Sequence, residues 1–534
     1  MTKRPYTFIL FFLLTLVISA QSRYAEHSKL STGKWVKIRV KKEGVYQLTS
    51  SALKNMGFSN PEKVSLYGYN LPMLPETSIE DISDDLTEIP LYRKPDGTVL
   101  FYSCGTIQWN RKDSSSAYTH KNNPYSNYIY YFLNESGTPA TFEKTSAQPA
   151  ATDAGQDTYY AHTLLEEDAY SFLNCGRIFF DSYDYATGPR KTYNLTFDNQ
   201  SHGDITLEVK FGTSGSSSSS LSVSVGDNNL GTLPFAAPGQ YESASVASKS
   251  FTLYDQYATS LSVTLQHTRT SGASGHLDYL CASYPAQLSV EGKNYLPFQS
   301  DKEEAGTIPF AIKGANSNIS VWEVTSPSQT RELTGTLSGT TYYVEPQTAS
   351  NFKNQFVAVN TSASFPAPET VGTVANQDLH ALDSINLLII VPSNGILTTQ
   401  AQRLATAHET KDGIKCAVVT AEQVYNEFSS GTPDATAYRR VMKMLFDRQY
   451  KTSPLTGTQQ GGLNLLLFGN CVWDNRLITS GFSSLSQDDY LLAYESDNSW
   501  SHTDSYVAEE YFTLLADGKG ASPLKDTPDC GVGR

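Results

Sequence analysis

The sequence predicts a multidomain protein in which N-terminal all-β domains, of β-sandwich or jelly-roll type, precede the opening half of an α/β domain with a parallel sheet. Its 534 residues exceed what one hydrophobic core can hold, so several domains are expected. Charged residues make up only 18%, while 33 residues are Tyr, a usage typical of exported, strand-rich proteins. From residue 385 onward, alternating patterns give way to continuous apolar runs separated by helical spacing.

The first 20 residues have the pattern of a secretory signal peptide. Lys3 and Arg4 precede an apolar run over 8–18, and the small Ala20 suits cleavage before Gln21. The run is too short for a membrane-spanning helix, which needs about 20 apolar residues. The segment therefore predicts export, with an uncleaved anchor as the alternative.

Residues 21–190 are predicted to form a β-rich domain. Residues 35–40 alternate, turn at Glu43-Gly44 and resume over 45–48, which indicates a β-hairpin. A short helix is expected over 50–56, and further strands at 64–67, 89–93, 99–102 and 128–133. The stretch 138–156 is rich in Ala, Thr, Ser and Pro and is interpreted as a linker or long surface loop.

Regular strand spacing predicts a β-sandwich domain over 191–290. Its strands are expected at 193–197, 205–211, 221–225, 250–253, 261–265 and 277–284. A small β domain and linker follow over 291–375, with strands at 319–324 and 341–344. The Pro-rich segment 365–368 marks its end.

Residues 384–534 are predicted to form a parallel α/β sheet. The apolar run 385–391 is typical of a strand buried on both faces. Strands at 416–419 and 463–468 alternate with two helices, of which the first has one apolar face made of Leu397, Ala401, Leu404, Ala405 and His408. This β-α-β-α-β order predicts parallel pairing with right-handed crossovers. Because another strand begins near 531–534, we expect the domain to be incomplete.

Composition and cysteine spacing exclude several functions. A formal net charge of −14 repels phosphate backbones, so nucleic acid is not an expected partner. The six cysteines, Cys104, Cys175, Cys281, Cys416, Cys471 and Cys530, are widely spaced without a CxxC, which fits neither a disulfide framework nor a zinc site. The sequence leaves their disulfide state open and predicts no cofactor or metal.

Cys471 is the strongest candidate nucleophile by position, because it directly follows a buried strand and open α/β sheets bind ligands at the carboxyl ends of their strands. No histidine is placed in the sequence to activate it, so a catalytic role is not expected. Cys416 is expected in the core, and Cys530 either at the surface or buried.

The remaining polar residues that could suggest a catalytic or metal site are assigned structural roles or positions beside a cleft. His408 is expected to be packed on its helix, whereas His502 either lines a cleft or is solvated. The acidic run 80–85 spaces its oxygens like a calcium loop, but Leu86 occupies the position that needs glycine, which favours a solvated loop. Asp474 and Asp504 follow strand ends and are assigned to the rim of a cleft.

Several segments carry a family resemblance. Residues 422–440, EQVYNEFSSGTPDATAYRR, resemble the start of the peptidase domain in the gingipain family of cysteine peptidases, and within it the PorU-like sortases of the type IX secretion system. Further similar segments lie at 37–40, 43–46, 120–126, 376–380, 465–469, 474–476, 505–507, 510–512 and 531–534. The resemblance spans nearly the whole chain and corresponds to the N-terminal part of such proteins.

The resemblance implies a caspase-like peptidase domain with a Cys nucleophile and a His partner. Such sortases remove a C-terminal signal domain from exported cargo and join the cargo to an anionic lipopolysaccharide at the outer-membrane surface of Gram-negative bacteria, together with other secretion-system proteins. A thioester intermediate suits this transfer because an amine can attack it. The family's His and Cys lie beyond Arg534, so no catalytic residue is assigned in this chain, and the fragment is expected to be inactive.

Two functions remain open. The first is the N-terminal portion of a surface cysteine peptidase that acts as a transpeptidase. The second is a non-catalytic adhesin or scaffold with a gingipain-like α/β domain, which the departure Asn470-Cys471 favours, because the family usually has Asp-Gly there. Neither cargo nor oligomeric state follows from the sequence.

Overall fold

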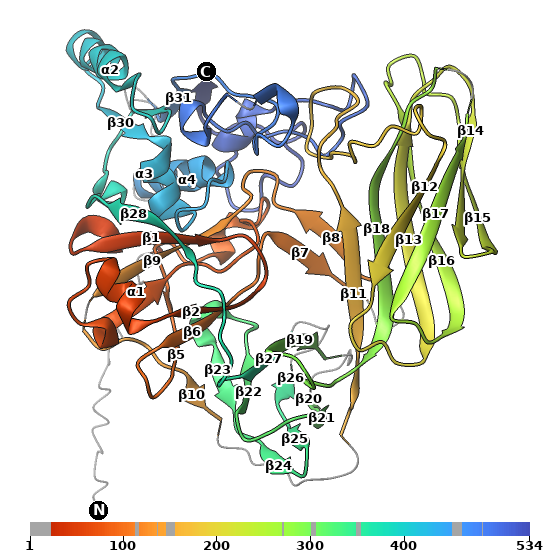
Figure 1. Cartoon of the computed structure of the whole chain (residues 1–534). Coiled ribbons are helices and arrows are strands. Elements are labelled where there is room, and N and C mark those ends of the chain that lie inside the picture. Colours follow the sequence, from red (N-terminus) through yellow and green to blue (C-terminus); the bar gives the residue numbers. More distant parts are fainter. Residues whose placement is uncertain are drawn as a thin grey trace, which may run out of the picture.

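The computed structural model describes residues 23–112, 117–135, 137–145, 155–269, 272–300, 306–348, 354–450, 462–482 and 484–534. Within these ranges the chain is mostly β and forms several separate sheets, while helices α2, α3 and α4 gather at one end (Figure 1). The predicted signal peptide lies outside the described residues. None of the helices in the described ranges has the length and apolar character needed to cross a membrane.

Two sheets build the N-terminal β unit around a shared core. Helix α1 (Ser50–Asn55) packs on them and begins at Thr49, whose side chain caps the helix by accepting a hydrogen bond from Ala52 N. The first sheet has the order β28-β1-β9-β3-β4 and the second β2-β6-β5, with strands β28 (Glu369–Val374), β1 (Trp35–Val40), β9 (Ile129–Glu135), β3 (Val64–Tyr67), β4 (Glu88–Ile89), β2 (Gly44–Leu48), β6 (Val99–Ser103) and β5 (Tyr92–Arg93).

The hairpin predicted over 35–48 is wrong, although both of its strands form. β1 pairs with β9 on one side and β28 on the other, so neither edge is left for β2, which pairs with β6 instead. Gly44, at a φ of 153°, starts β2 where a Cβ would lie 2.8 Å from the hydroxyl of Tyr295. The strand predicted at 89–93 is divided into β4 and β5 at Pro90, which has no N–H to donate.

The central β-sandwich consists of two four-stranded antiparallel sheets, seen on the right in Figure 1. Burial alternates along β12, as expected for a strand with one face on the core. One sheet has the order β11-β18-β13-β16 and the other β12-β17-β14-β15, with strands β11 (Thr158–Glu166), β18 (Gly275–Gln287), β13 (Gly203–Thr213), β16 (Ser245–Gln256), β12 (Arg190–Thr196), β17 (Ser260–Thr268), β14 (Ser219–Val225) and β15 (Asn228–Phe235).

A smaller β unit lies at the bottom centre of Figure 1 and shares the hydrophobic core of the sandwich. Its main sheet has the order β10-β23-β22-β27-β19. A hairpin of β7 and β8 lies between the N-terminal unit and the sandwich in Figure 1. The strands of the main sheet are β10 (Glu143–Lys144), β23 (Arg331–Leu333), β22 (Ile319–Glu323), β27 (Gln355–Asn360) and β19 (Tyr295–Gln299), and those of the hairpin are β7 (Ile107–Asn110) and β8 (Thr119–Asn122). Two smaller sheets complete the unit: one has the order β21 (Phe310–Lys313), β25 (Thr341–Val344), β24 (Thr336–Ser338), and the other pairs β20 (Gly306–Thr307) with β26 (Gln347–Thr348).

The sheets do not follow the predicted domain limits 21–190, 191–290 and 291–375. β11 comes from the predicted N-terminal domain but pairs with β18 of the sandwich. β10 comes from the predicted linker and pairs with β23, and β28 follows the Pro-rich segment and returns to β1. Each of these segments adds one strand to a sheet built from a distant part of the sequence, which a pass along the chain cannot detect.

The parallel sheet predicted within 384–534 is present, with the strand order β30-β29-β31-β32. Ala401 and Ala405 of α2 pack on one face of β29, whereas α3 and α4 pack on the other. Gly413, in the left-handed conformation, ends α2, and Thr420 with Gln423 forms a capping box at α3. The elements are β29 (Leu387–Val391), α2 (Thr398–Asp412), β30 (Cys416–Thr420), α3 (Ala421–Phe428), α4 (Thr436–Tyr450), β31 (Asn464–Leu467) and β32 (Gly531–Gly533).

A buried ionic cluster joins this α/β half to the N-terminal unit. Glu427 and His380 are both fully buried, and Glu427 Oε2 lies 2.6 Å from His380 Nδ1. His380 Nε2 lies 3.2 Å from Asp84 Oδ2 without hydrogen-bond alignment, and the imidazole stacks on Phe428. Burial opposes the charged imidazole, but the interactions with Asp84 and Glu427 outweigh it and raise the pKa of His380 to about 9.

We expect this cluster to make stability depend on pH. The folded pKa of His380 exceeds the ordinary value of about 6.5, so its contribution is complete below about pH 6.5 and is lost as pH rises through about 9. The expected loss is about 3 kcal/mol at most. Urea unfolding of the protein and of His380→Asn at pH 6 and pH 9.5 measures it. Glu495 and Asp278 also titrate in this range, because burial raises their pKa values to about 8 and about 7. Both proteins contain them, so the difference between the two pH dependences of the unfolding free energy reports on His380 alone. An equal pH dependence of both proteins would contradict the assignment.

Candidate active site

The loops that follow β29 and β31 meet at the carboxyl edge of the parallel sheet, where open α/β sheets bind ligands. Gly469 permits the close approach, because a Cβ there would lie 2.8 Å from Pro392 Cγ. Asn394 fixes the loop after β29: its N–H donates to Asp488 O at 2.9 Å, and its side-chain amide donates to Asp489 Oδ1 at 3.1 Å. The edge of the sheet is thus held by specific contacts.

Asn475 fixes the loop after β31 from within, because its side chain is almost fully buried. Its amide exchanges two hydrogen bonds of 3.1 Å with the backbone of Ala493. Its carbonyl accepts hydrogen bonds from the Tyr490 hydroxyl at 2.7 Å and from Gln487 Nε2 at 3.0 Å. This segment is therefore a rigid wall beside the sheet edge.

Cys471 lies in the same loop, close to the ion pair of Arg534 and Glu509. Arg534 Nε donates to Glu509 Oε1 at 2.7 Å, so the guanidinium charge is neutralised within the pair. Burial raises the pKa of the Cys471 thiol, and Arg534 only partly offsets this. At neutral pH, Cys471 is a thiol rather than a thiolate nucleophile.

All nine histidines lie in the described residues, and each has a partner other than Cys471. His502 Nε2 lies 3.1 Å from the Ser243 hydroxyl of the sandwich. His408 is half-buried and pairs with Asp412 at 2.6 Å, so its predicted packing on the apolar face of the helix is wrong. The others contact partners outside this edge, as follows: His27 with Asp378, His120 with Glu166, His162 with Trp109, His202 with Asp255, His267 with Thr213, His276 with Asp181 and His380 with Glu427.

The other cysteines show the same lack of activation. All six are free thiols. Cys416, at the start of edge strand β30, packs against the α/β core as expected but is only partly buried, and Cys530 is also partly buried against this core. Burial raises the pKa of every thiol, to about 12 for Cys281 and Cys530. The described residues include all six cysteines and all nine histidines, and among them burial disfavours every thiolate and no Cys–His hydrogen bond forms.

The structure separates the two aspartates assigned to the cleft rim. Asp474 is fully buried, and its Oδ2 accepts hydrogen bonds from Thr479 N at 2.7 Å and from the Thr479 hydroxyl at 2.8 Å. It therefore shapes the loop and is not open to solvent. Asp504 is exposed and accepts a hydrogen bond from the Ser501 hydroxyl at 3.2 Å.

The acidic run 80–85 is more than a solvated loop. Asp84 Oδ2 accepts a hydrogen bond from Ala25 N at 2.8 Å and lies beside His380. Asp85 is buried and accepts hydrogen bonds from the backbone N–H groups of Lys29 and Leu86 at 2.7 Å. These carboxylates bind the N-terminal segment, which explains why the loop is acidic without a calcium pattern.

Sequence reasoning missed Glu495, a buried carboxyl at the contact with the sandwich. Its Oε2 accepts a hydrogen bond from Gly176 N at 2.7 Å, while Oε1 is buried without a partner. Burial raises its pKa to about 8, so the group is mostly neutral at pH 7. Gly176 has a φ of 78°, and a Cβ there would lie 2.0 Å from Asn498 O. No local pattern in the sequence marks this pair, because the two residues are 319 positions apart.

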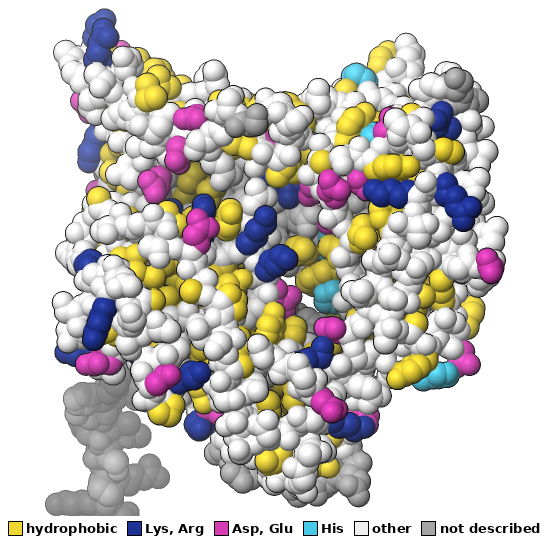
Figure 2. Space-filling model, viewed as in Figure 1, with side chains coloured by type: hydrophobic (Ala, Val, Ile, Leu, Met, Phe, Trp, Pro, Cys, Tyr) yellow, Lys and Arg dark blue, Asp and Glu magenta, His cyan; other side chains and the backbone are white. Residues whose placement is uncertain are grey.

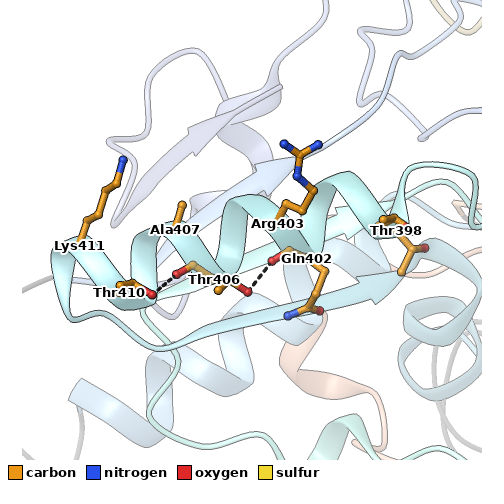
Figure 3. Close-up of a pocket in the computed structure, with 8 residues that line it drawn as sticks. Thr398, Gln402, Arg403, Thr406, Ala407, Thr410 and Lys411 are labelled. Atoms are coloured by element: carbon orange, nitrogen blue, oxygen red, sulfur yellow. Dashed lines mark hydrogen bonds between the residues drawn. The ribbon is translucent and has the colours of Figure 1, made fainter.

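A shallow hollow lies on the outer face of α2 (Figure 3). All of its lining side chains come from one helix, and the hydroxyls of Thr406 and Thr410 bond to carbonyls of the preceding turn. Because no other element supplies an opposite wall, this surface is not a candidate site.

Comparisons with known proteins give one match to the C-terminal region, which contains the parallel sheet, and one to nearly the whole chain. Residues 380–534 match the family model peptidase family C25. The chain is similar to dimeric latent PorU from Porphyromonas gingivalis, with 28% identity and a TM-score of 0.84 over 96% of this chain and 48% of that chain. The chain thus spans about half the length of that PorU chain. These two matches confirm the family resemblance predicted from the sequence.

Several other structural matches have TM-scores of at most 0.17. A carbohydrate-binding module of a xylanase from the hindgut metagenome of Trinervitermes trinervoides matches at 11% identity, a TM-score of 0.17, 23% of this chain and 96% of that chain. A module of LamC from Zobellia galactanivorans matches at 14% identity, a TM-score of 0.14, 24% of this chain and 98% of that chain. Scores this low carry no argument. No curated protein sequence matches the chain.

Proposed function

We propose that this PorU-like chain, with its peptidase family C25 region at 380–534, is the N-terminal portion of an exported cysteine peptidase that acts as a sortase of the type IX secretion system. The similarity to PorU over 96% of the chain carries the proposal, because it includes the β units as well as the α/β half. A parallel sheet with helices on both faces supports a caspase-like peptidase domain.

The proposed parent enzyme cleaves a C-terminal signal domain from exported cargo and transfers the cargo to an anionic lipopolysaccharide. A Cys nucleophile forms a thioester with the cargo, and an amine of the acceptor then attacks it. A His serves first as general base and then as general acid. In this chain all thiols have raised pKa values and none contacts a histidine, which supports placing the reacting pair in the rest of the parent protein.

The proposed location is the outer-membrane surface of a Gram-negative bacterium, reached through the signal peptide at 1–20. The proposed partners are the cargo, the lipopolysaccharide and other surface proteins of the secretion system, but not nucleic acid. The net charge of −14 supports the exclusion of nucleic acid, and the strand-rich composition supports export.

A thiol-reactive peptide probe tests the assignment. We expect the parent protein to be labelled at a cysteine outside residues 1–534 and to cleave a cargo with its C-terminal signal domain. The chain of residues 1–534 alone is expected to do neither, because its thiols are protonated at neutral pH. Labelling is measured by mass spectrometry of tryptic peptides.

The variant Cys471→Ser in the parent protein is the matched control. It is expected to retain labelling and cleavage. Loss of both, with the fold intact by circular dichroism, would identify Cys471 as the nucleophile and overturn the assignment.

The second candidate function is a non-catalytic surface adhesin or scaffold. The departure Asn470-Cys471 from the Asp-Gly that the family usually has after this strand favours it. A parent protein that binds cargo but neither cleaves it nor reacts with the probe would establish this alternative.

A further inference from the structure

A cavity of about 450 Å³ lies where the N-terminal unit, the β7–β8 hairpin, the sandwich and the small β unit meet. It opens near the middle of the face shown in Figure 2. Its volume falls in the range of small-molecule sites, which favour the junctions between structural units. It lies outside the α/β half and shares no lining residue with the carboxyl edge of the sheet.

Aromatic rings form much of the cavity wall. Trp109 and His162 are in contact, with ring centroids 3.7 Å apart, and Tyr118 lies 4.5 Å from His162. On the opposite side of the junction, Phe298 stacks on Phe356 at 5.4 Å. Tyr102, Tyr159, Tyr160 and Tyr284 complete the aromatic lining. Ring faces carry negative charge density and attract cations.

Glu43 contributes a carboxylate to this aromatic wall. Its Oε1 accepts a hydrogen bond from the Tyr102 hydroxyl, whereas no described side chain forms an ion pair with it. Burial raises its pKa, and the hydrogen bond from Tyr102 only partly offsets this. Glu43 is half-buried, and a carboxylate that has lost part of its hydration without gaining a cation is costly, so a ligand cation would reduce that cost.

The groups around Glu43 supply no positive charge. The negative charge of Glu43 helps to raise the pKa values of Tyr102 and Cys104 in the N-terminal unit, Tyr159 in the sandwich and Tyr295 in the small unit. None of these is cationic. No Lys or Arg is among the described residues that line the cavity.

Apart from Glu43, the lining side chains whose ordinary pKa allows a charge near neutral pH are His162 and Asp198, and neither changes this balance. Burial lowers the pKa of His162 to about 3, so its ring is neutral at physiological pH. Asp198 at the mouth of the cavity is already paired with Lys293 at 3.0 Å. The Arg111 guanidinium, which is outside the lining, lies over the rings of Tyr160 and Tyr118 at 4.3 Å and 5.6 Å but forms no ion pair with Glu43. The cavity therefore presents the remaining aromatic faces and one acid without an ion pair among the described residues.

We propose that this cavity binds an organic cation, an ammonium or guanidinium group, whose charge pairs with Glu43 and whose apolar part packs among the aromatic rings. The same chemistry is offered by a free amine and by a Lys or Arg side chain of a polypeptide. An anionic ligand is disfavoured by the acid, and a neutral ligand would leave it unpaired.

Binding of methylguanidinium to the purified protein, measured by isothermal titration calorimetry, tests the proposal against N-methylurea, a neutral planar analogue. We expect methylguanidinium to bind at least about tenfold more tightly than N-methylurea and to lose that advantage in Glu43→Gln. The matched control Glu62→Gln changes an exposed acid of the same unit and should bind like the unmodified protein. The peptide Gly-Arg-Gly distinguishes the sources, because tighter binding than methylguanidinium indicates a polypeptide ligand and weaker binding indicates a free cation.

If Glu43→Gln fails to fold, the pH dependence of methylguanidinium binding to the unmodified protein tests the proposal instead. Affinity for methylguanidinium should rise as pH increases through the raised pKa of Glu43, while affinity for N-methylurea should stay constant. The proposal is overturned by equal binding of methylguanidinium and N-methylurea, or by a folded Glu43→Gln that keeps the cation preference. Binding of glucose that is unaffected by Glu43→Gln, without binding of the cation, would also overturn it.

Discussion

Replacing Glu427 by alanine is expected to lower the free energy of unfolding of the α/β half by about 3–5 kcal/mol. Its carboxylate is fully buried and accepts hydrogen bonds from Leu379 N at 2.8 Å, His380 N at 3.1 Å and Gln377 Nε2 at 2.9 Å, in addition to the contact with the His380 ring. The truncation leaves these donors and a charged imidazole without their acceptor. Chemical denaturation, with hydrogen exchange of the amides in 377–382 and α3, measures the loss.

The control is Glu422→Ala on the same helix. Glu422 is half-exposed, and its partner Lys37, 3.5 Å away, is buried. Lys37 keeps its hydrogen bond to Asn426 Oδ1 at 2.9 Å, so removal of Glu422 should cost about 1–2 kcal/mol, less than removal of Glu427. Glu427→Gln should fall between the two alanine variants, because it keeps one acceptor oxygen but no charge. If Glu427→Ala and Glu422→Ala lose equal stability, the cluster does not hold the α/β half on the N-terminal unit.

Local patterns predicted most individual strands, but not the partners of those strands. The alternation at β1 is correct, yet its neighbours β9 and β28 start 94 and 334 residues later. The α/β half was more predictable, because apolar runs such as β29 and the spacing of Ala401 and Ala405 encode parallel pairing and helix packing locally. Long-range pairing depends on chain closure, which single-segment patterns do not contain.

The same limit applies to the candidate sites. Cys471 was placed correctly at the end of a buried strand, since its position follows from β31 alone. Glu43 and Glu495 carried no signal, because a carboxylate becomes unusual only when tertiary packing buries it beside groups far away in the sequence. Asp474 was assigned to an open rim from its position after a strand, but burial depends on the Thr479 turn that folds back over it.

Replacing Arg439 by alanine is expected to destabilise the α/β half by about 4 kcal/mol or more. The guanidinium is almost fully buried and donates to three carbonyls: Nε to Leu514 O at 2.8 Å, Nη1 to Glu76 O at 2.7 Å and Nη2 to Lys519 O at 2.6 Å. These bonds tie α4 to the loop 514–520 and to the N-terminal unit. Gly520 lets this fork fit, because a Cβ there would lie 2.2 Å from Nη1. Thermal unfolding and limited proteolysis of the loop 514–520 measure the loss.

Arg439→Lys separates charge from geometry. A single ammonium cannot reach three carbonyls that lie in different directions, so we expect this variant to lose most of the stability that Arg439→Ala loses. Arg403→Ala, on the exposed face of α2 in Figure 3, is the matched control and should change stability by less than about 0.5 kcal/mol. If Arg439→Lys unfolds like the unmodified protein, charge alone suffices and the fork of three hydrogen bonds is not what joins these segments.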